Sequence, residues 1–476
     1  MLFNSLAFAI FLPVVLAGYY LLRGSHKGQN RLLLAASLFF YACWDWRFLS
    51  LLFITMIVDF YVAAHLEDLH ERGAPDGRRR RVLAISMFCN LAMLGFFKYC
   101  NFFIGSMQTL LTALHVPVHT HLLSIVLPVG ISFFTFQSMS YTIDVYRGEL
   151  KPTRDFWDFA LFVSFFPHLV AGPIMRAVDL LPQITHPRSV SREQISDGIH
   201  LIIWGLWKKV FVADGLAPLV NATFGTPVAS GFDTWTAVLA FAFQIYCDFS
   251  GYTDIARGVA KLMGFELTLN FNLPYFSRNP QEFWTRWHIS LSNWLRNYLY
   301  IPLGGNRHGA FGTYRNLMLT MVIGGLWHGA AWNFVLWGAY QGLLLVVHRY
   351  ASRHWPAALH VRQPSAAITA LKIIVMFQFT CYGWLLFRAN SLRQVIDMTA
   401  ALTHPFDTVD WSRLEHIAVF AAPLVLVQWY QYVSGELLFL RLRWLPPELK
   451  SSCYAVLMYF VIFHAAAPQA FIYFQF

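Results

Sequence analysis

Residues 1–22 read MLFNSLAFAIFLPVVLAGYYLL, an uncharged apolar run that ends at Arg23. A helix that crosses a bilayer needs roughly 20 such residues. A secretory signal peptide carries its positive charge ahead of the apolar run, whereas here the first basic residue follows it. We therefore expect residues 1–22 to form an uncleaved first helix of a membrane protein, with its N-terminus outside.

Apolar runs recur along the whole chain. Of its 476 residues, 57% are hydrophobic and 13% are charged, against about 45–50% and about 25% in a soluble domain. This composition excludes a disordered chain, a collagen and a disulfide-stapled secreted fold. We predict an all-α polytopic membrane protein with about 10–12 transmembrane helices, in a single domain over residues 1–476. The runs lie near 2–22, 32–44, 48–64, 82–104, 122–141, 157–171, 198–213, 235–249, 316–328, 331–348, 367–387, 414–433 and 453–475.

The formal net charge of +10 has two readings, a nucleic-acid ligand or basic cytoplasmic loops. Basic residues gather in the loops 23–31, 65–81 and 147–154, and none lies between 105 and 121. This alternation favours the second reading, with the basic loops in the cytoplasm and no nucleic-acid partner. The six cysteines are scattered without the spacing of metal ligands, so we predict no metal site.

Residues 250–315 are too polar for a span and too apolar for a free loop. Aromatic and basic residues alternate there, as is typical of a membrane interface. We predict an amphipathic helix that lies along the cytoplasmic surface or dips into the protein, ended by Pro302 and the glycines that follow it. The apolar positions that set its helical spacing are Phe283, Trp287, Leu291, Trp294 and Tyr298.

Two histidines stand out as candidates for chemistry. His328 lies between two apolar runs in GGLWHGAAWN, residues 324–333. An ionisable group at membrane depth is costly and usually faces a cavity or a partner, and an imidazole can exchange protons near neutral pH. The small residues around it would admit a thin ligand or another helix. His288, in WTRWHIS, could face a cytoplasmic portal. For both, a purely structural hydrogen-bonded histidine is the alternative.

Charged residues form a second group of candidates. Asp248 ends an apolar run and Asp254 follows it; for both we favour a structural pairing, with Arg257 or another nearby arginine, over acid–base catalysis. Arginines 278, 286, 296 and 307 could bind the phosphates of a donor or anionic lipid headgroups.

The remaining histidines are expected to be structural or solvated. The exception is His168, a weaker candidate for chemistry, where the neighbouring prolines and glycine indicate a broken helix or a turn. His200 and His464 lie on apolar faces and are expected to be structural. The trio His115, His119 and His121 is a weak metal patch at most, and solvation is the better reading.

Short motifs are spread through most of the chain. They read FFYA at 39–42, FPHLVAGP at 166–173, WKK at 207–209, AD at 213–214, DFSGYTD at 248–254, NFNLPY at 270–275, GGLWHG at 324–329 and FIYFQF at 471–476, and the longest runs from EFW at 282–284 through PLGGNR at 302–307. Together they resemble the membrane-bound O-acyltransferase family, in the bacterial branch of alginate and peptidoglycan O-acetylation proteins. One departure is Asn297, where that family often has an aspartate.

The resemblance implies a fold of helices around a central tunnel and a catalytic role for His328, with His288 as the earlier polar catalytic position. Donor binding would fall to Arg278, Arg286, Arg296, Trp287 and Asn333, while Asp248 and Asp254 would be structural polar residues of the tunnel.

The resemblance also implies a reaction and its participants. An acyl thioester, expected to be acetyl-CoA, would enter from the cytoplasm as a substrate, with no permanently bound cofactor. His328 would act as general base or hold the acyl group itself. The chain has no Gly-Asp-Ser block of the kind used by secreted esterases, so an extracytoplasmic acetyltransferase partner would place the group on a polysaccharide. We expect location in the inner membrane, in contact with lipid.

Two other functions stay open. The first is a D-alanyl transfer protein of teichoic acid modification, although the PLGGNR motif favours the acetylation branch. The second is a transporter or export channel, although the paired halves with broken helices that many transporters show are not detectable here.

Overall fold

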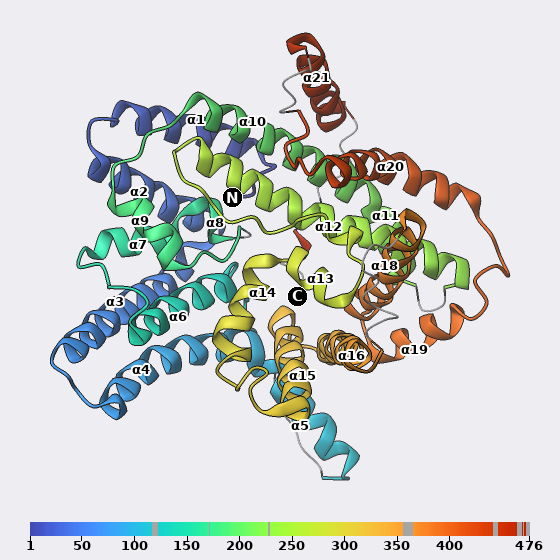
Figure 1. The fold of residues 1–476 in the computed structure, drawn as a ribbon, viewed down its shortest axis with the longest axis horizontal. Helices are drawn as coiled ribbons and strands as arrows, with labels where there is room; N and C mark the ends of the chain where they lie inside the picture. The colour runs from blue at the N-terminus through green and yellow to red at the C-terminus, as the bar shows by residue number, and fades with distance from the viewer. Residues whose placement is uncertain are drawn as a thin grey trace. The chain divides into compact units, whose positions relative to one another are not determined.

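The computed structural model describes residues 1–116, 122–170, 172–226, 229–355, 365–440, 446–463, 469 and 471–472. Within these residues all regular structure is helical, which confirms the predicted all-α fold (Figure 1). The chain divides into two compact units, and each is described by itself. Unit 1 comprises Met1–Ile199 and Ala256–Thr268, and unit 2 comprises His200–Ile255 and Leu269–Phe476. The predicted single domain over 1–476 stays a prediction.

Unit 1 begins with long apolar helices and continues with shorter ones. Ser25 caps the second helix, because its hydroxyl accepts the N–H of Gly28. The helices of this unit are α1 (Leu6–Leu21), α2 (His26–Asp45), α3 (Leu49–Glu71), α4 (Asp76–Leu94), α5 (Cys100–Ala113), α6 (Ile131–Arg147), α7 (Phe156–Ser164), α8 (Phe166–Leu169) and α9 (Ala177–Thr185).

Four helical stretches in the described part of the chain are long and apolar enough to cross a bilayer. They are His26–Glu71 and Asp76–Ala113 in unit 1, and Ala366–Arg388 and Trp411–Ser434 in unit 2. Length and hydropathy thus support the predicted membrane protein, while the predicted number of spans stays a prediction.

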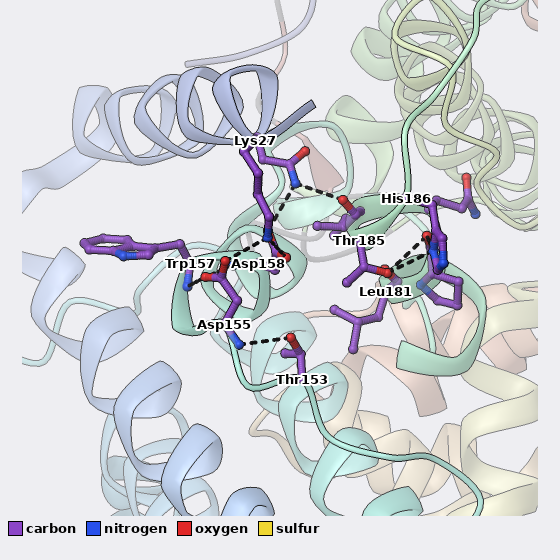
Figure 2. A network of polar contacts seen from close by, with 12 residues as sticks. Lys27, Thr153, Asp155, Trp157, Asp158, Leu181, Thr185 and His186 are labelled. Atoms are coloured by element: carbon purple, nitrogen blue, oxygen red, sulfur yellow. Dashed lines mark hydrogen bonds and ion pairs between the residues drawn. The ribbon is translucent and has the colours of Figure 1, made fainter. Parts of the chain in front are cut away.

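A polar network ties α2 to α7 and α9 within unit 1 (Figure 2). Lys27 Nζ lies 2.8 Å from Asp155 Oδ2 and 2.6 Å from Asp158 Oδ2. Asn30 Nδ2 donates to Asp158 Oδ1 at 3.1 Å and to the carbonyl of Ile184 at 2.8 Å. Asp158 is almost wholly buried, so these hydrogen bonds offset the cost of removing its carboxylate from water.

Two helices of unit 1 differ from the sequence prediction. The helix expected over 122–141 begins only at Ile131, because Gly130 precedes it with a left-handed φ of 76°. A Cβ on Gly130 would lie 2.7 Å from the carbonyl oxygen of Leu169, so only glycine fits. The helix expected over 157–171 is interrupted at Phe165, and Pro167 lies in the first turn of α8, where its missing N–H is tolerated.

Unit 2 carries both candidate histidines. Its helices are α11 (Asp214–Phe224), α12 (Gly231–Lys261, of which residues 231–255 belong here), α13 (Pro280–Arg286), α14 (Ile289–Leu295), α15 (Gly309–His328), α16 (Trp332–His354), α18 (Ala366–Arg388), α19 (Leu392–Ala401), α20 (Trp411–Ser434) and α21 (Pro447–Phe463); α10 (Arg192–Leu206) contributes residues from 200 onward. The predicted polar segment 250–315 therefore begins inside α12.

The single amphipathic helix predicted over residues 283–298 is wrong. The chain leaves the helical conformation at Trp287 and His288, which separates α13 from α14, and a π-helical segment follows at Arg296–Tyr300. His288 has a left-handed backbone, with φ 42° and ψ 55°. No proline or glycine marks this break, and the apolar spacing continues across it, so the sequence pattern predicts one continuous helix.

We expect Asp158→Ala to lower the free energy of unfolding by about 1.5–3 kcal/mol, because it removes one of the two acceptors of the buried Asn30 amide and one of the two carboxylates that pair with Lys27. Thermal unfolding in detergent micelles, followed by tryptophan fluorescence, measures the loss. Arg393→Ala is the control: it breaks an exposed pair with Asp397 and is expected to cost less than about 0.5 kcal/mol. Equal losses in the two variants would contradict the importance of the network.

Candidate functional site

The structure brings the two candidate histidines together, although 40 positions separate them in the sequence. Their ring centroids lie 6.3 Å apart, with an angle of 54° between the ring planes. His288 is fully buried and His328 is 4% exposed. The prediction named both residues as catalytic, and their proximity within unit 2 makes them the centre of the candidate site.

His328 is the last residue of α15, and close helix packing fixes its position. Gly329 is extended, and α16 begins three residues later. A Cβ on Gly325 would lie 2.3 Å from the carbonyl oxygen of Phe334, and a Cβ on Gly338 would lie 2.4 Å from that of Met321. Small residues therefore let α15 and α16 approach closely. Of the two roles expected for the small residues around His328, the contact at Gly325 shows the approach of another helix.

Aromatic rings surround the histidine pair. The ring centroid of Phe249 lies 4.6 Å from that of His288, while Trp337 and Phe387 lie 5.0 and 5.5 Å from His328. Sequence reasoning gave none of these three aromatic residues a role at the site: Phe249 lies in the DFSGYTD motif of α12, and Trp337 and Phe387 lie on α16 and α18 outside the quoted motifs. The apolar surroundings lower the local dielectric and strengthen any electrostatic interaction made there.

Trp287 and Asn333, both predicted to bind the donor, are buried. Trp287 is 1% exposed and its ring packs 4.7 Å from that of Trp384. Asn333 Nδ2 donates to the carbonyl of Ala389 at 3.0 Å, which ties the start of α16 to the residue that follows α18. Both residues therefore support the wall of the site, and donor binding by them stays a prediction.

Arg278 and Arg286 are joined by Glu282. Arg278 Nε lies 2.9 Å from Glu282 Oε2, and Arg286 Nη2 lies 2.9 Å from Glu282 Oε1. Burial raises the pKa of Glu282, but hydrogen bonds and charge from Arg278, with Arg286, outweigh it and hold that pKa below its usual value. The i, i+4 spacing of the three residues could have revealed this set. Arg296 opens the π-helical segment and is exposed.

Asp248 and Asp254 form structural ion pairs, as expected, and each pairs with a lysine. Lys209 Nζ lies 2.6 Å from Asp248 Oδ1 and 2.8 Å from Asp214 Oδ1, and Lys208 Nζ lies 2.7 Å from Asp254 Oδ2. The arginine expected for Asp248 is wrong. Two adjacent lysines in an apolar run need carboxylate partners, and this signal was overlooked.

The buried charges also hold the segment around Phe471. Lys209 Nζ donates to the carbonyl of Gln469 at 3.2 Å, and the N–H of Ile472 donates to Asp248 Oδ2 at 2.7 Å. Phe471 is fully buried and packs 5.8 Å from Phe249 between ring centroids. Asp248 and Phe249 are consecutive residues of α12, so these buried charges lie one residue away from the ring that contacts His288.

The other histidines and the described cavities lie elsewhere. His168 belongs to unit 1, His115 is exposed, and His119, His121 and His464 fall outside the described residues, as do residues 473–476 of the FIYFQF motif. A cavity of about 510 Å³ lies beside Tyr340 and Phe379, and one of about 520 Å³ lies beside Arg47 and Phe97. Neither cavity is lined by the histidine pair, so the predicted tunnel stays a prediction.

Comparison with known proteins bears on the whole site. The family model of the membrane-bound O-acyltransferases matches residues 154–388, a range that contains both histidines. The chain is 42% identical to the probable alginate O-acetylase of Azotobacter vinelandii over 87% of this chain and 79% of that protein. It is 43% identical to the probable alginate O-acetylase of Pseudomonas aeruginosa, over 84% of this chain and 75% of that protein. It is 36% identical to the peptidoglycan O-acetyltransferase of Helicobacter pylori, over 83% of this chain and 78% of that protein.

Lys209→Met should lower the free energy of unfolding by about 3–5 kcal/mol, because it strands two buried carboxylates. Unfolding in detergent micelles measures this. Adding Asp248→Asn to that variant should recover part of the loss, since one stranded carboxylate is removed. A double variant less stable than Lys209→Met alone would show that the ion pair is not the source of the effect.

Proposed function

Because the chain belongs to the membrane-bound O-acyltransferase family and is an acyltransferase, we propose that it transfers an acetyl group from a cytoplasmic thioester for O-acetylation of a polysaccharide outside the inner membrane. The observation that carries this proposal is the pair of buried imidazoles, 6.3 Å apart between ring centroids. The named activities of the relatives, alginate O-acetylation and peptidoglycan O-acetylation, support acetyl as the group and a polysaccharide as the final acceptor.

The chemistry follows from what an imidazole can do in dry surroundings. A hydroxyl oxygen attacks the thioester carbonyl, His328 takes the hydroxyl proton, and the C–S bond breaks as the ester C–O bond forms. The same proton then returns to the departing thiolate, so that an alcohol and a thioester become an ester and a thiol. His288, on the other side of the pair, stabilises charge that develops on the carbonyl oxygen. In the alternative route His328 itself carries the acyl group between two transfers.

The donor in this proposal is acetyl-CoA, bound as a substrate without a resident cofactor. Its phosphates need cations on the cytoplasmic side, and Arg278, Arg286 and Arg296 are the candidates. Arg278 and Arg286 share one carboxylate, Glu282, so this trio keeps a net positive charge for an anionic donor. The burial of both histidines supports the exclusion of water that would otherwise hydrolyse the thioester.

The remaining participants follow from sidedness. The basic loops 23–31, 65–81 and 147–154 support a cytoplasmic side for these loops, and we assign the donor to that side. The acceptor side then faces outward, where an extracytoplasmic acetyltransferase partner passes the group to the polysaccharide. Membrane lipid surrounds the chain, and the positive charge has no nucleic-acid partner.

His328→Ala is expected to abolish acetyl transfer while the purified protein still binds acetyl-CoA, because the substitution removes the proton acceptor and leaves the donor cations in place. Transfer of radiolabelled acetyl in reconstituted membranes and equilibrium binding of acetyl-CoA are the two measurements. His200→Ala is the matched control, since His200 is also buried in unit 2 and pairs with Tyr454, and it should keep normal transfer.

The same membranes, also assayed with labelled D-alanine and for polymer transport, separate the competing functions. Full transfer by His328→Ala would refute the catalytic role. Incorporation of D-alanine in place of acetyl would replace the proposal by D-alanyl transfer. Transport of the polymer without turnover of acetyl-CoA would replace it by an export function.

Arg296→Gln should raise the KM for acetyl-CoA by about fivefold with kcat nearly unchanged, because an exposed cation contributes to binding the donor but not to the reacting centre. Steady-state kinetics in nanodiscs measure both constants. Arg393→Gln, an exposed arginine of α19, is the control and should leave KM unchanged. A fall in kcat at constant KM would contradict the assignment of Arg296 to the donor.

A further inference from the structure

The break between α13 and α14 creates a local problem of hydrogen bonding. The first N–H groups of a helix have no partner within the helix and need a cap. His288 stands at the capping position of α14, but its side chain makes no capping hydrogen bond and its backbone is left-handed. A non-glycine residue in that conformation is strained and persists only where its surroundings impose it.

Asn270 supplies the missing cap from a segment that lies 18 residues before His288. Its backbone carbonyl accepts the N–H of Ile289 at 3.0 Å. Its side-chain Oδ1 accepts both the N–H of Ser290, at 3.1 Å, and the hydroxyl of Ser290, at 3.0 Å. Asn270 is 1% exposed, so water does not replace these bonds when they are lost.

The same segment also holds the other side of the break. The N–H of Asn272 donates to the carbonyl of Arg286 at 2.9 Å, and Arg286 Nη1 donates to the carbonyl of Asn272 at 3.1 Å. Residues 270–272 therefore form hydrogen bonds to the end of α13 and to the start of α14, with His288 between them, and we call this segment the strap. The strap fixes the direction of both helices at the point where the imidazole leaves the backbone.

The strap acts against what the local sequence favours. The apolar spacing of Phe283, Trp287 and Leu291 suits one continuous helix. If residues 287 and 288 became helical, α13 and α14 would merge and the side chain at 288 would leave from a different helical face. The ring would then lose its position beside His328. The left-handed backbone at His288 thus depends on the bonds that Asn270 makes.

We propose that Asn270 is a positioning residue for acyl transfer: the capping bonds of its carboxamide oxygen hold the break that places the His288 ring beside His328. This inference rests on the proposed function, since it assigns His288 a part in the reaction. Asn270 Nδ2 has no hydrogen-bond partner within the described residues. The oxygen alone therefore carries the role, and an aspartate at this position keeps every hydrogen bond of the side chain.

The test compares two variants of nearly equal size. Asn270→Leu removes the acceptor, and we expect kcat for acetyl transfer to fall by about tenfold or more while the KM for acetyl-CoA stays within about twofold, because a misplaced catalytic group affects the reacting centre and not donor binding. Asn270→Asp keeps the acceptor and should restore kcat to within about threefold of the parent. Gln431→Leu is the control, since it removes another buried amide in unit 2, on α20, and should keep the parent kcat per folded protein.

A second measurement does not depend on activity. Diethyl pyrocarbonate modifies accessible imidazoles, and peptide mass spectrometry gives the rate at each histidine. His288 is fully buried, so its labelling should be slow in the parent, in Asn270→Asp and in Gln431→Leu, and several-fold faster in Asn270→Leu. Parent-like kcat and parent-like labelling in Asn270→Leu would overturn the proposal, and so would an Asn270→Asp variant as impaired as Asn270→Leu.

The two measurements distinguish the two proposals. A parent protein that transfers no acetyl group refutes the proposed function, while the labelling rates still decide whether Asn270 holds His288 in place. A parent that transfers acetyl, together with unchanged kcat in Asn270→Leu, refutes only the positioning role.

Discussion

The candidate site depends on one constraint: a helix can be broken inside an apolar body only if the exposed N–H groups find partners in the protein. No water is present in apolar surroundings to bond these N–H groups, and each unpaired N–H costs free energy. At His288 the carbonyl and carboxamide oxygens of Asn270 meet this requirement. The break in turn lets a short loop carry an imidazole to the end of α15, where a straight helix would not deliver it. The geometry of the histidine pair is thus a consequence of backbone hydrogen bonding.

A second constraint is charge neutrality, and it acts through the lysines of the WKK motif. Lys209 is 1% exposed, a position that an ammonium group occupies only with close partners. Asp248 and Asp214 are these partners. Lys209 also donates to the carbonyl of Gln469, and Asp248 also accepts the N–H of Ile472. Buried ions thereby hold elements that are far apart in the sequence.

Much of the fold and the two central residues could be predicted from the sequence, because composition and apolar runs report burial directly. His328 and His288 were found because an ionisable group among apolar residues is costly, and because the surrounding motifs resemble a known family. The break at Trp287 was missed, since the apolar period continues across it and neither proline nor glycine marks it. Its cause, Asn270, lies outside any window in which periodicity is read. The lysine partners were missed for a related reason: Lys209 and Asp248 lie 39 positions apart, and only the fold pairs them.

The two constraints meet on α12. Asp248 forms an ion pair with Lys209, and the ring centroid of the next residue, Phe249, lies 4.6 Å from that of His288. Adjacent residues on a helix point about 100° apart, so α12 can face the buried lysine with one side chain and the imidazole with the next. Because both residues belong to α12, a shift of this helix that changes the ion pair also changes the ring contact. The ion pair therefore limits where Phe249 can lie, and Phe249 limits one side of the space left to the His288 ring. The geometry of the histidine pair is thus set by the packing of a few helices, whose positions are fixed by ion pairs and capping bonds outside the pair itself.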